Sequence, residues 1–198
     1  MGSISENFVR EYFELNNFSV KINKKYAFSS QRRNDLEEIN LIVQNIKDNV
    51  DEGEKKKPFL LEESSIQKIK KGIVEVKGWH TGKFSPSVLI KSPHIFNFVE
   101  KKVLKAAERF LGTKDFKKIL VIPRLPKAKD TRNKSIKIMK EKGIDHVLEF
   151  KTILDYIIQH IKINKNYIES DILQTIRLLK NYDLIKDRQL ELFSKNDR

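Results

Sequence analysis

The chain has 198 residues, of which 39% are hydrophobic and 34% are charged, and its formal net charge is +13. This length suits one domain with a small appendage. The absence of cysteine excludes disulfides and thiolate metal sites. No apolar run approaches the roughly 18 residues that a membrane-spanning helix needs. The strong positive charge favours a polyanionic partner, either nucleic acid or an anionic membrane surface.

The N-terminus and the histidines narrow the class of protein further. Residues 1–7 lack the basic start and apolar middle of a signal peptide, which predicts a cytoplasmic protein. The 4 histidines are scattered without the spacing of metal ligands, so we expect any metal to be held by oxygen atoms. A peripheral membrane protein or an RNA-binding protein would share the charge. No stretch has the basic polar face opposite Trp or Phe that interfacial membrane helices show, which disfavours a membrane partner.

The first half of the chain predicts one helix and three strands. Phe8, Val9, Tyr12 and Phe13 recur at helix spacing, and the alternation that follows them indicates a strand. Two polar segments, one of them highly charged, are predicted as loops. In chain order, the predictions are a helix over 5–15, a strand over 18–22, a loop over 23–34, a strand over 38–43, a mobile connection over 48–57 and a strand over 73–77.

The second half alternates helices and strands. Gly112 is the expected C-cap of a long amphipathic helix, and the apolar run over 119–122 predicts a strand that is covered on both faces. The predictions are a short strand over 88–90, a helix over 95–111, a strand over 119–122, a basic loop over 124–134, a helix over 136–142, a strand over 144–150, and helices over 152–161 and 168–179. Such alternation argues for an α/β fold with a central mixed sheet flanked by helices.

The strand over 73–77 carries the strongest chemical signal. Side chains alternate between the faces of a strand, so Glu75 and Lys77 share one face while Val74 and Val76 point into a core. A carboxylate and an ammonium group beside each other admit two interpretations. One is a salt bridge on an exposed face. The other is a metal site, in which Glu75 holds a divalent cation and Lys77 acts on what the cation binds.

An N-terminal helix with an early Glu6, a strand with polar Asn40, and the sequence Glu75-Val76-Lys77 before a helix resemble the PD-(D/E)xK nuclease superfamily. The resemblance covers residues 5–161, which it implies form a restriction-endonuclease-like domain, with 162–198 as a helical C-terminal extension. It implies a DNA endonuclease that uses Mg²⁺ or Mn²⁺. It also implies catalytic roles for Lys77, Glu75 and Asn40, and metal ligation by Glu75, Asn40, the Val76 carbonyl and Glu6.

Position 40 departs from the family, which has Asp where this chain has Asn40. An amide oxygen can ligate a divalent cation but brings no charge, so metal binding should be weaker. Three readings remain open. Asn40 ligates through its oxygen, or Glu38 or Asp35 takes its place, or the site is impaired and the protein binds DNA without cutting it.

Basic residues outside the strand supply candidates for phosphate contacts. Trp79 is either a base-stacking residue or a partly buried core aromatic, and most single lysines are expected to be merely solvated. A homodimer is expected by analogy alone, and the last two helices supply either its surface or simple packing. The predicted nucleic-acid-binding residues are Arg32, Arg33, Trp79, Lys83, Arg124, Lys127, Lys129 and Arg132.

Overall fold

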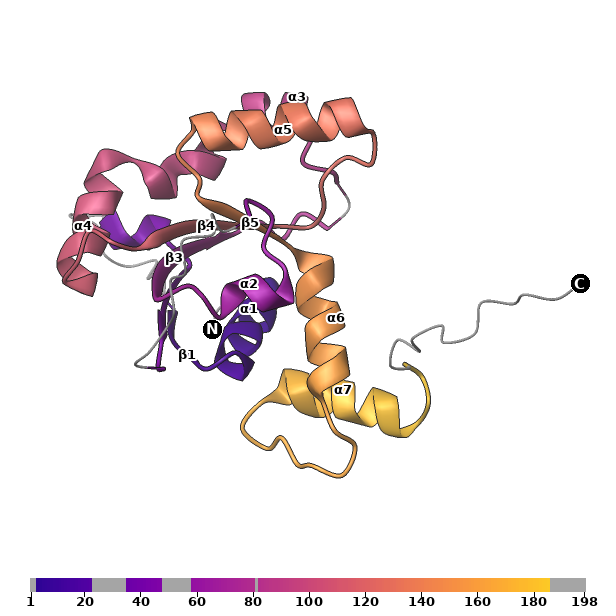
Figure 1. Ribbon diagram of the computed structural model, residues 1–198. Helices are drawn as coiled ribbons and strands as arrows, with labels where there is room; N and C mark the ends of the chain where they lie inside the picture. Colours follow the sequence, from indigo (N-terminus) through magenta and orange to yellow (C-terminus); the bar gives the residue numbers. More distant parts are fainter. Residues whose placement is uncertain (1–2, 23–34, 48–57, 81, 186–198) are drawn as a thin grey trace, which may run out of the picture.

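The computed structural model describes residues 3–22, 35–47, 58–80 and 82–185. A five-stranded sheet forms the middle layer, in the order β1-β2-β3-β4-β5 (Figure 1). The strands are β1 Phe18–Ile22, β2 Leu41–Asn45, β3 Lys71–Val76, β4 Lys117–Ile122 and β5 His146–Glu149. The fold is therefore α/β with a mixed sheet, as the alternation of elements predicts.

The sheet has an antiparallel half and a parallel half. β1 pairs with β2, and β2 with β3, in antiparallel register. β3, β4 and β5 run parallel. The carboxyl ends of these three strands therefore share one end of the sheet, which is where open α/β sheets bind their ligands.

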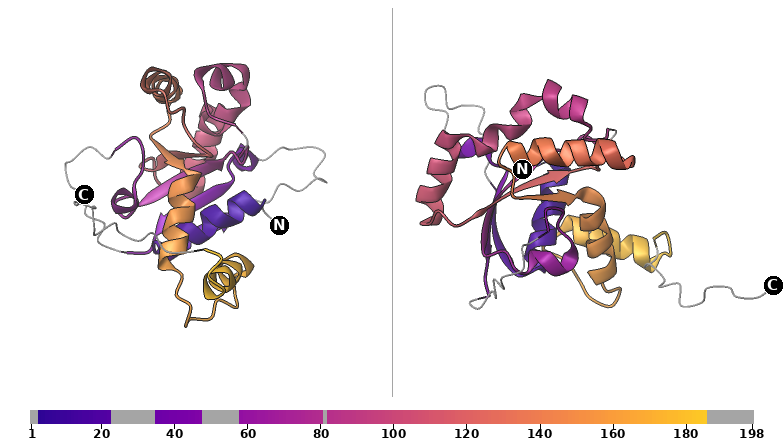
Figure 2. Two further views of the ribbon diagram at one scale, coloured as in Figure 1. Left: turned by 90° about the vertical axis from the view of Figure 1, so that its right-hand side faces the viewer. Right: turned by 45° about the horizontal axis from the view of Figure 1, so that its top comes forward.

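Helices cover both faces of the sheet (Figure 2). The first face packs against α1 Ile4–Leu15, the short α2 Glu63–Ile66 and α6 Phe150–His160, and α7 Asp171–Asn181 packs in turn against α1. The second face packs against α3 Pro86–Lys91, the 3₁₀ segment η2 Pro93–Val99, α4 Lys101–Leu111 and α5 Lys129–Glu141. No helix among these described residues is long and apolar enough to cross a membrane.

Strand alternation divides the interior into two cores. Val74 and Val76 point into the first core, as predicted, whereas Ile73 points into the second. β4 contributes side chains to both cores, because Ile119 lies in the first core and Leu120 in the second. The prediction that this strand is covered on both faces is confirmed.

Four predicted elements differ from the structure. The segment 88–90 is helical because Ser85 caps α3, where its Oγ accepts from the Val88 N–H (3.4 Å), and Pro86 opens the first turn. The helix predicted over 95–111 is split at Glu100, which is extended (φ −65°, ψ 145°). Gly112 ends α4 with φ +67°, which confirms the predicted C-cap.

The other two differences concern boundaries near the predicted site. The strand predicted over 38–43 begins only at Leu41, because η1 Asp35–Glu38 is a 3₁₀ turn. Half of the basic loop predicted over 124–134 is the beginning of α5, which starts at Lys129. The predicted segments 23–34 and 48–57 lie outside the described residues, and the domain boundary at 161 stays a prediction.

Candidate functional site

The carboxyl end of β3 holds a buried ion pair. Glu75 is 5% exposed, and Lys77 Nζ lies 2.6 Å from its Oε1. The prediction that the two side chains share one face is confirmed. The face is buried, so a salt bridge on an exposed surface is the wrong description. Desolvating two charges costs several kcal/mol per ion, and a pair in this position is therefore a poor stabilising device.

Glu6 reaches this region from the first turn of α1. It completes a capping box with Ser3: the Ser3 N–H donates to Glu6 Oε2 (3.0 Å), and the Glu6 N–H donates to Ser3 Oγ (3.2 Å). Its other oxygen, Oε1, accepts from Asn40 Nδ2 at 2.8 Å. Glu6 therefore has a tertiary partner in addition to its favourable position at the helix N-terminus.

Asn40 connects three elements that are far apart in the sequence. It is 6% exposed and sits directly before β2. Its Oδ1 accepts from the Val76 N–H at 2.7 Å, while its Nδ2 donates to Glu6. Leu41 is paired with Val74, so one further step of this register brings Asn40 opposite Glu75. The structure thus brings Glu6, Asn40 and the Glu75–Lys77 pair to one end of β3.

A close contact between α1 and the residues after β3 supports this arrangement. Ser5 Oγ lies 3.0 Å from His80 Nε2, and the His80 ring packs against Phe150 with centroids 4.5 Å apart. A Cβ atom at Gly78 would lie 2.6 Å from Ser5 Oγ, so any larger residue there would force the Ser5 side chain to shift. Sequence patterns do not reveal Ser5 and His80 as partners, because no local pattern joins residues 75 positions apart.

Glu38 and Asp35 are the predicted alternatives to Asn40 as a metal ligand. Glu38 Oε2 accepts from Asn97 Nδ2 (3.3 Å), which engages it with η2 on the second face. Asp35 is the first residue of η1.

The donor set available to a metal ion is poor in carboxylates. In the described parts of the chain, no three His, Cys, Asp or Glu side chains cluster closely enough to hold a metal ion. Glu6, Glu75, the Asn40 amide and the Val76 carbonyl are oxygen donors, which suit Mg²⁺ or Mn²⁺. Such a donor set would carry a low charge, and its affinity would be weaker than that of a site with three carboxylates.

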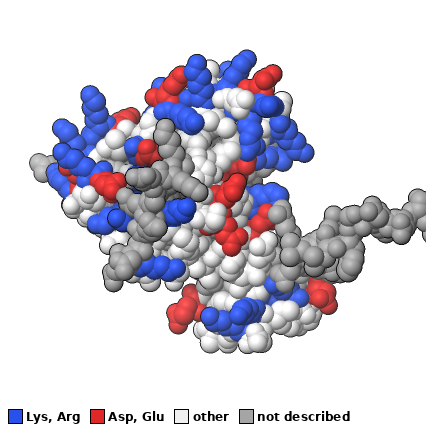
Figure 3. Space-filling model, in the orientation of Figure 1, with Lys and Arg blue, Asp and Glu red and all other residues white. Residues whose placement is uncertain are grey.

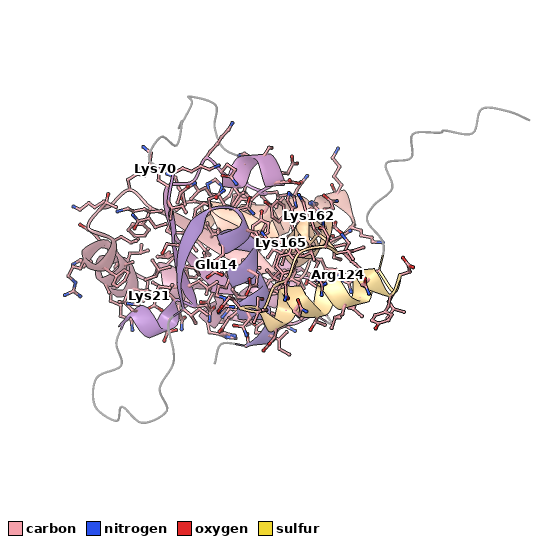
Figure 4. The ribbon with its side chains drawn as sticks, turned by 90° about the horizontal axis from the view of Figure 1, so that it is seen from below. Glu14, Lys21, Lys70, Arg124, Lys162 and Lys165 are labelled. Atoms are coloured by element: carbon pink, nitrogen blue, oxygen red, sulfur yellow. The ribbon has the colours of Figure 1, made fainter. Side chains whose placement is uncertain are left out.

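Exposed basic residues occur in the segments that follow β3 and β4. Lys83, Arg124, Lys127 and Lys129 are exposed, and the Phe84 N–H donates to the Arg124 carbonyl (3.0 Å), joining their two loops. Arg124 lies toward the right in Figure 4, away from Lys21 and Lys70. Arg132 instead lies 3.5 Å from Glu149 Oε2. Arg32 and Arg33 lie outside the described residues.

Trp79 is partly buried, as one of its two interpretations predicts, and its role in base stacking stays a prediction. Its ring stacks on Phe84 with centroids 5.7 Å apart and planes at 22°, yet 42% of the residue is exposed. One side of the Trp79 ring therefore packs against the second core, and part of the residue faces solvent.

No family model matches the chain, and no curated protein or solved structure matches it either.

Proposed function

We propose that the protein is a metal-dependent DNA endonuclease of the PD-(D/E)xK type, which hydrolyses phosphodiester bonds at the carboxyl end of β3. The observation that carries the proposal is that Asn40 hydrogen-bonds both Glu6 and the Val76 N–H, directly beside the Glu75–Lys77 ion pair at the end of β3. The element order supports it: α1, three antiparallel strands, helices, and then β4 parallel to β3 agree with the restriction-endonuclease-like fold that the resemblance implies.

Each residue has a role that its chemistry allows. Glu75, Asn40, Glu6 and the Val76 carbonyl would hold Mg²⁺ or Mn²⁺, which supplies Lewis acidity and a more acidic bound water. Lys77, now 2.6 Å from Glu75, would orient the attacking water or donate to the phosphate oxygens as negative charge develops. Asn40 holds the end of β3 against α1 through its two hydrogen bonds.

DNA would lie across the surface formed by Lys83, Arg124, Lys127 and Lys129, which is exposed at the same end of the sheet. Lysine and arginine contacts to phosphates make affinity fall steeply with salt concentration. Trp79 offers a partly exposed ring for stacking on a base.

Asn40 also favours a second candidate, a nuclease-fold protein that binds DNA without cutting it. Its Nδ2 donates to Glu6, a bond that an aspartate could not make, and its Oδ1 already accepts from a backbone N–H. The Asn40 amide is therefore fully hydrogen-bonded, and it is a neutral group at a position where a metal site gains from a negative one.

Nicking of supercoiled plasmid DNA with Mg²⁺ or Mn²⁺, and with chelator as the blank, tests both candidates. For an active nuclease, Lys77→Met, directly after β3, removes nicking, while Lys71→Met, at the opposite end of β3, retains it. Folding of both variants is checked by circular dichroism.

Three results separate the candidates. Salt-sensitive DNA binding without any nicking by the wild-type protein favours the second candidate. Nicking that survives in Lys77→Met contradicts the assigned mechanism. If the wild-type protein neither nicks nor binds DNA, both candidates are wrong.

A further inference from the structure

A groove lies between α4 and the start of β4, away from the candidate site. Its volume is about 310 Å³. One side is a single stripe of α4, because the lining residues on this helix are spaced by three and four positions. The other side consists of alternate residues leading into β4. The lining residues are Lys101, Leu104, Lys105, Glu108, Lys114, Phe116 and Lys118.

The rim of the groove is strongly basic. It carries four ammonium groups and one carboxylate, that of Glu108, which lies 3.7 Å from Lys114 Nζ. Lys118 Nζ lies 2.9 Å from Asp145 Oδ2. Among the described residues, Lys101 and Lys105 form no ion pair. Lys and Arg side chains gather over α4 at the left of Figure 3.

This charge does not stabilise α4 itself. Lys101 and Lys102 stand in the first turn, where the helix dipole disfavours cations, and the Glu100 side chain makes no capping bond. A local structural reason would place carboxylates at these positions. The lysines therefore point to an anionic partner outside the helix.

The floor of the groove is apolar. Leu104 and Phe116 are both half-buried and pack against the second core from the outside. Their remaining exposed surface lies between the two rows of lysines. Phosphate contacts need no such floor, whereas an apolar side chain gains about 25 cal/mol for each Å² that it buries there.

The groove lies at the opposite end of the sheet from the candidate site. Lys117 pairs with Gly72, whereas Glu75 pairs with Leu120. In Figure 1, α4 lies at the far left, and β5 leads into α6 at the right. The groove is therefore separate from the surface that we assign to DNA.

We propose that this groove binds an acidic segment of a partner protein, whose carboxylates face the lysine rows and whose apolar side chain enters between Leu104 and Phe116. The positive charge of the rim favours an anionic chain. The apolar floor favours a peptide, which can insert an apolar side chain, over a nucleic acid. A volume of about 310 Å³ is at the small end of ligand sites, which suits one or two side chains.

The test is a titration of the ¹⁵N-labelled full chain with an eight-residue synthetic peptide in which glutamates flank one leucine and one phenylalanine. Amide shifts confined to α4 and residues 114–118 are expected. The variant Lys101→Glu/Lys105→Glu should weaken binding at least tenfold. The matched control Lys162→Glu/Lys165→Glu, with the same charge change on exposed residues after α6, should bind as the wild type does.

Two further ligands test whether the groove recognises an apolar side chain and whether it prefers a peptide to DNA. A peptide with alanine in place of the leucine and phenylalanine should bind at least several-fold more weakly, because the floor then contributes nothing. Equal binding of that peptide, equal loss in the control variant, or no localised shifts at millimolar peptide would overturn the proposal. Stronger shifts of the same amides by a short DNA duplex would overturn it in favour of a nucleic-acid surface.

Discussion

The two ends of the central sheet use charge in opposite ways. At the carboxyl end of β3, Glu75 and Asn40 are about 5% exposed; Glu75 Oε1 accepts from Lys77 Nζ, and the Asn40 amide bonds Glu6 and the Val76 N–H. At the other end, Lys101 and Lys105 stand in solvent along a helix stripe. Buried charges demand exact partners, because desolvation is expensive, whereas exposed lysines demand almost none. The first end therefore depends on specific tertiary contacts, whereas the second depends only on the presence of several lysines.

Replacing Asn40 should give the largest effect on stability and sharpens this contrast. Asn40→Leu leaves Glu6 Oε1 and the Val76 N–H without their present partners at 2.8 and 2.7 Å. We expect the free energy of unfolding to fall by roughly 2–5 kcal/mol, about 1–3 for each orphaned group and more for the charged one. Urea unfolding monitored by circular dichroism measures it. A loss within 0.5 kcal/mol would mean that the bridge does not hold α1 to β3.

Asn40→Asp should make stability depend on metal. Without metal, a carboxylate at this position faces Glu6 and loses the bond from Nδ2, so the melting temperature should drop below that of the wild type. With millimolar Mg²⁺ or Mn²⁺ much of the loss should be regained, because a third carboxylate strengthens cation binding. Thermal scans with and without chelator compare the two proteins. A metal response no larger than that of the wild type would remove position 40 from the ligand set.

Gly78→Ala tests the close approach of α1 to the end of β3. The new Cβ would lie 2.6 Å from Ser5 Oγ, and we expect a cost of about 1–3 kcal/mol in unfolding free energy. In the double variant with Ser5→Ala, the nearest remaining atom at Ser5 is its Cβ at 3.2 Å, so part of the loss should be recovered. Additive losses in the double variant would show that the Ser5 hydroxyl is not what limits position 78.

The smallest effect is expected at the lysine groove. Lys101→Met and Lys105→Met should change the unfolding free energy by no more than about 0.5 kcal/mol, since both side chains are exposed. The same urea experiment provides the comparison with Asn40→Leu. Losses of equal size at both ends would contradict the distinction drawn between them.

The sequence predicted what depends on local patterns. β1 and the alternation within β3 are confirmed, since apolar periodicity reports burial directly. The strand predicted over 88–90 failed because the capping residue Ser85 and Pro86 outweigh a short β-branched run. The start of β2 failed because the turn η1 depends on its packing against α4.

The site itself was predictable only in part. The alternation of side chains between strand faces made the Glu75–Lys77 pair, two positions apart, predictable from the sequence. The bond from Asn40 to the Val76 N–H and the contact of Ser5 with His80 join residues 36 and 75 positions apart, so nothing local encodes them. The lysine groove was not predictable for a related reason. It forms only when α4 packs beside the start of β4, and neither segment alone predicts it.

Anomalous diffraction from crystals soaked in Mn²⁺ tests the central claim most directly. We predict an anomalous peak at the carboxyl end of β3, within coordination distance of a Glu75 oxygen and Asn40 Oδ1, with Lys77 displaced from its 2.6 Å contact with Glu75 or turned toward the ion's water shell. A fully occupied Mn²⁺ elsewhere in the crystal, with no peak between residues 40 and 75, would contradict a metal-dependent nuclease.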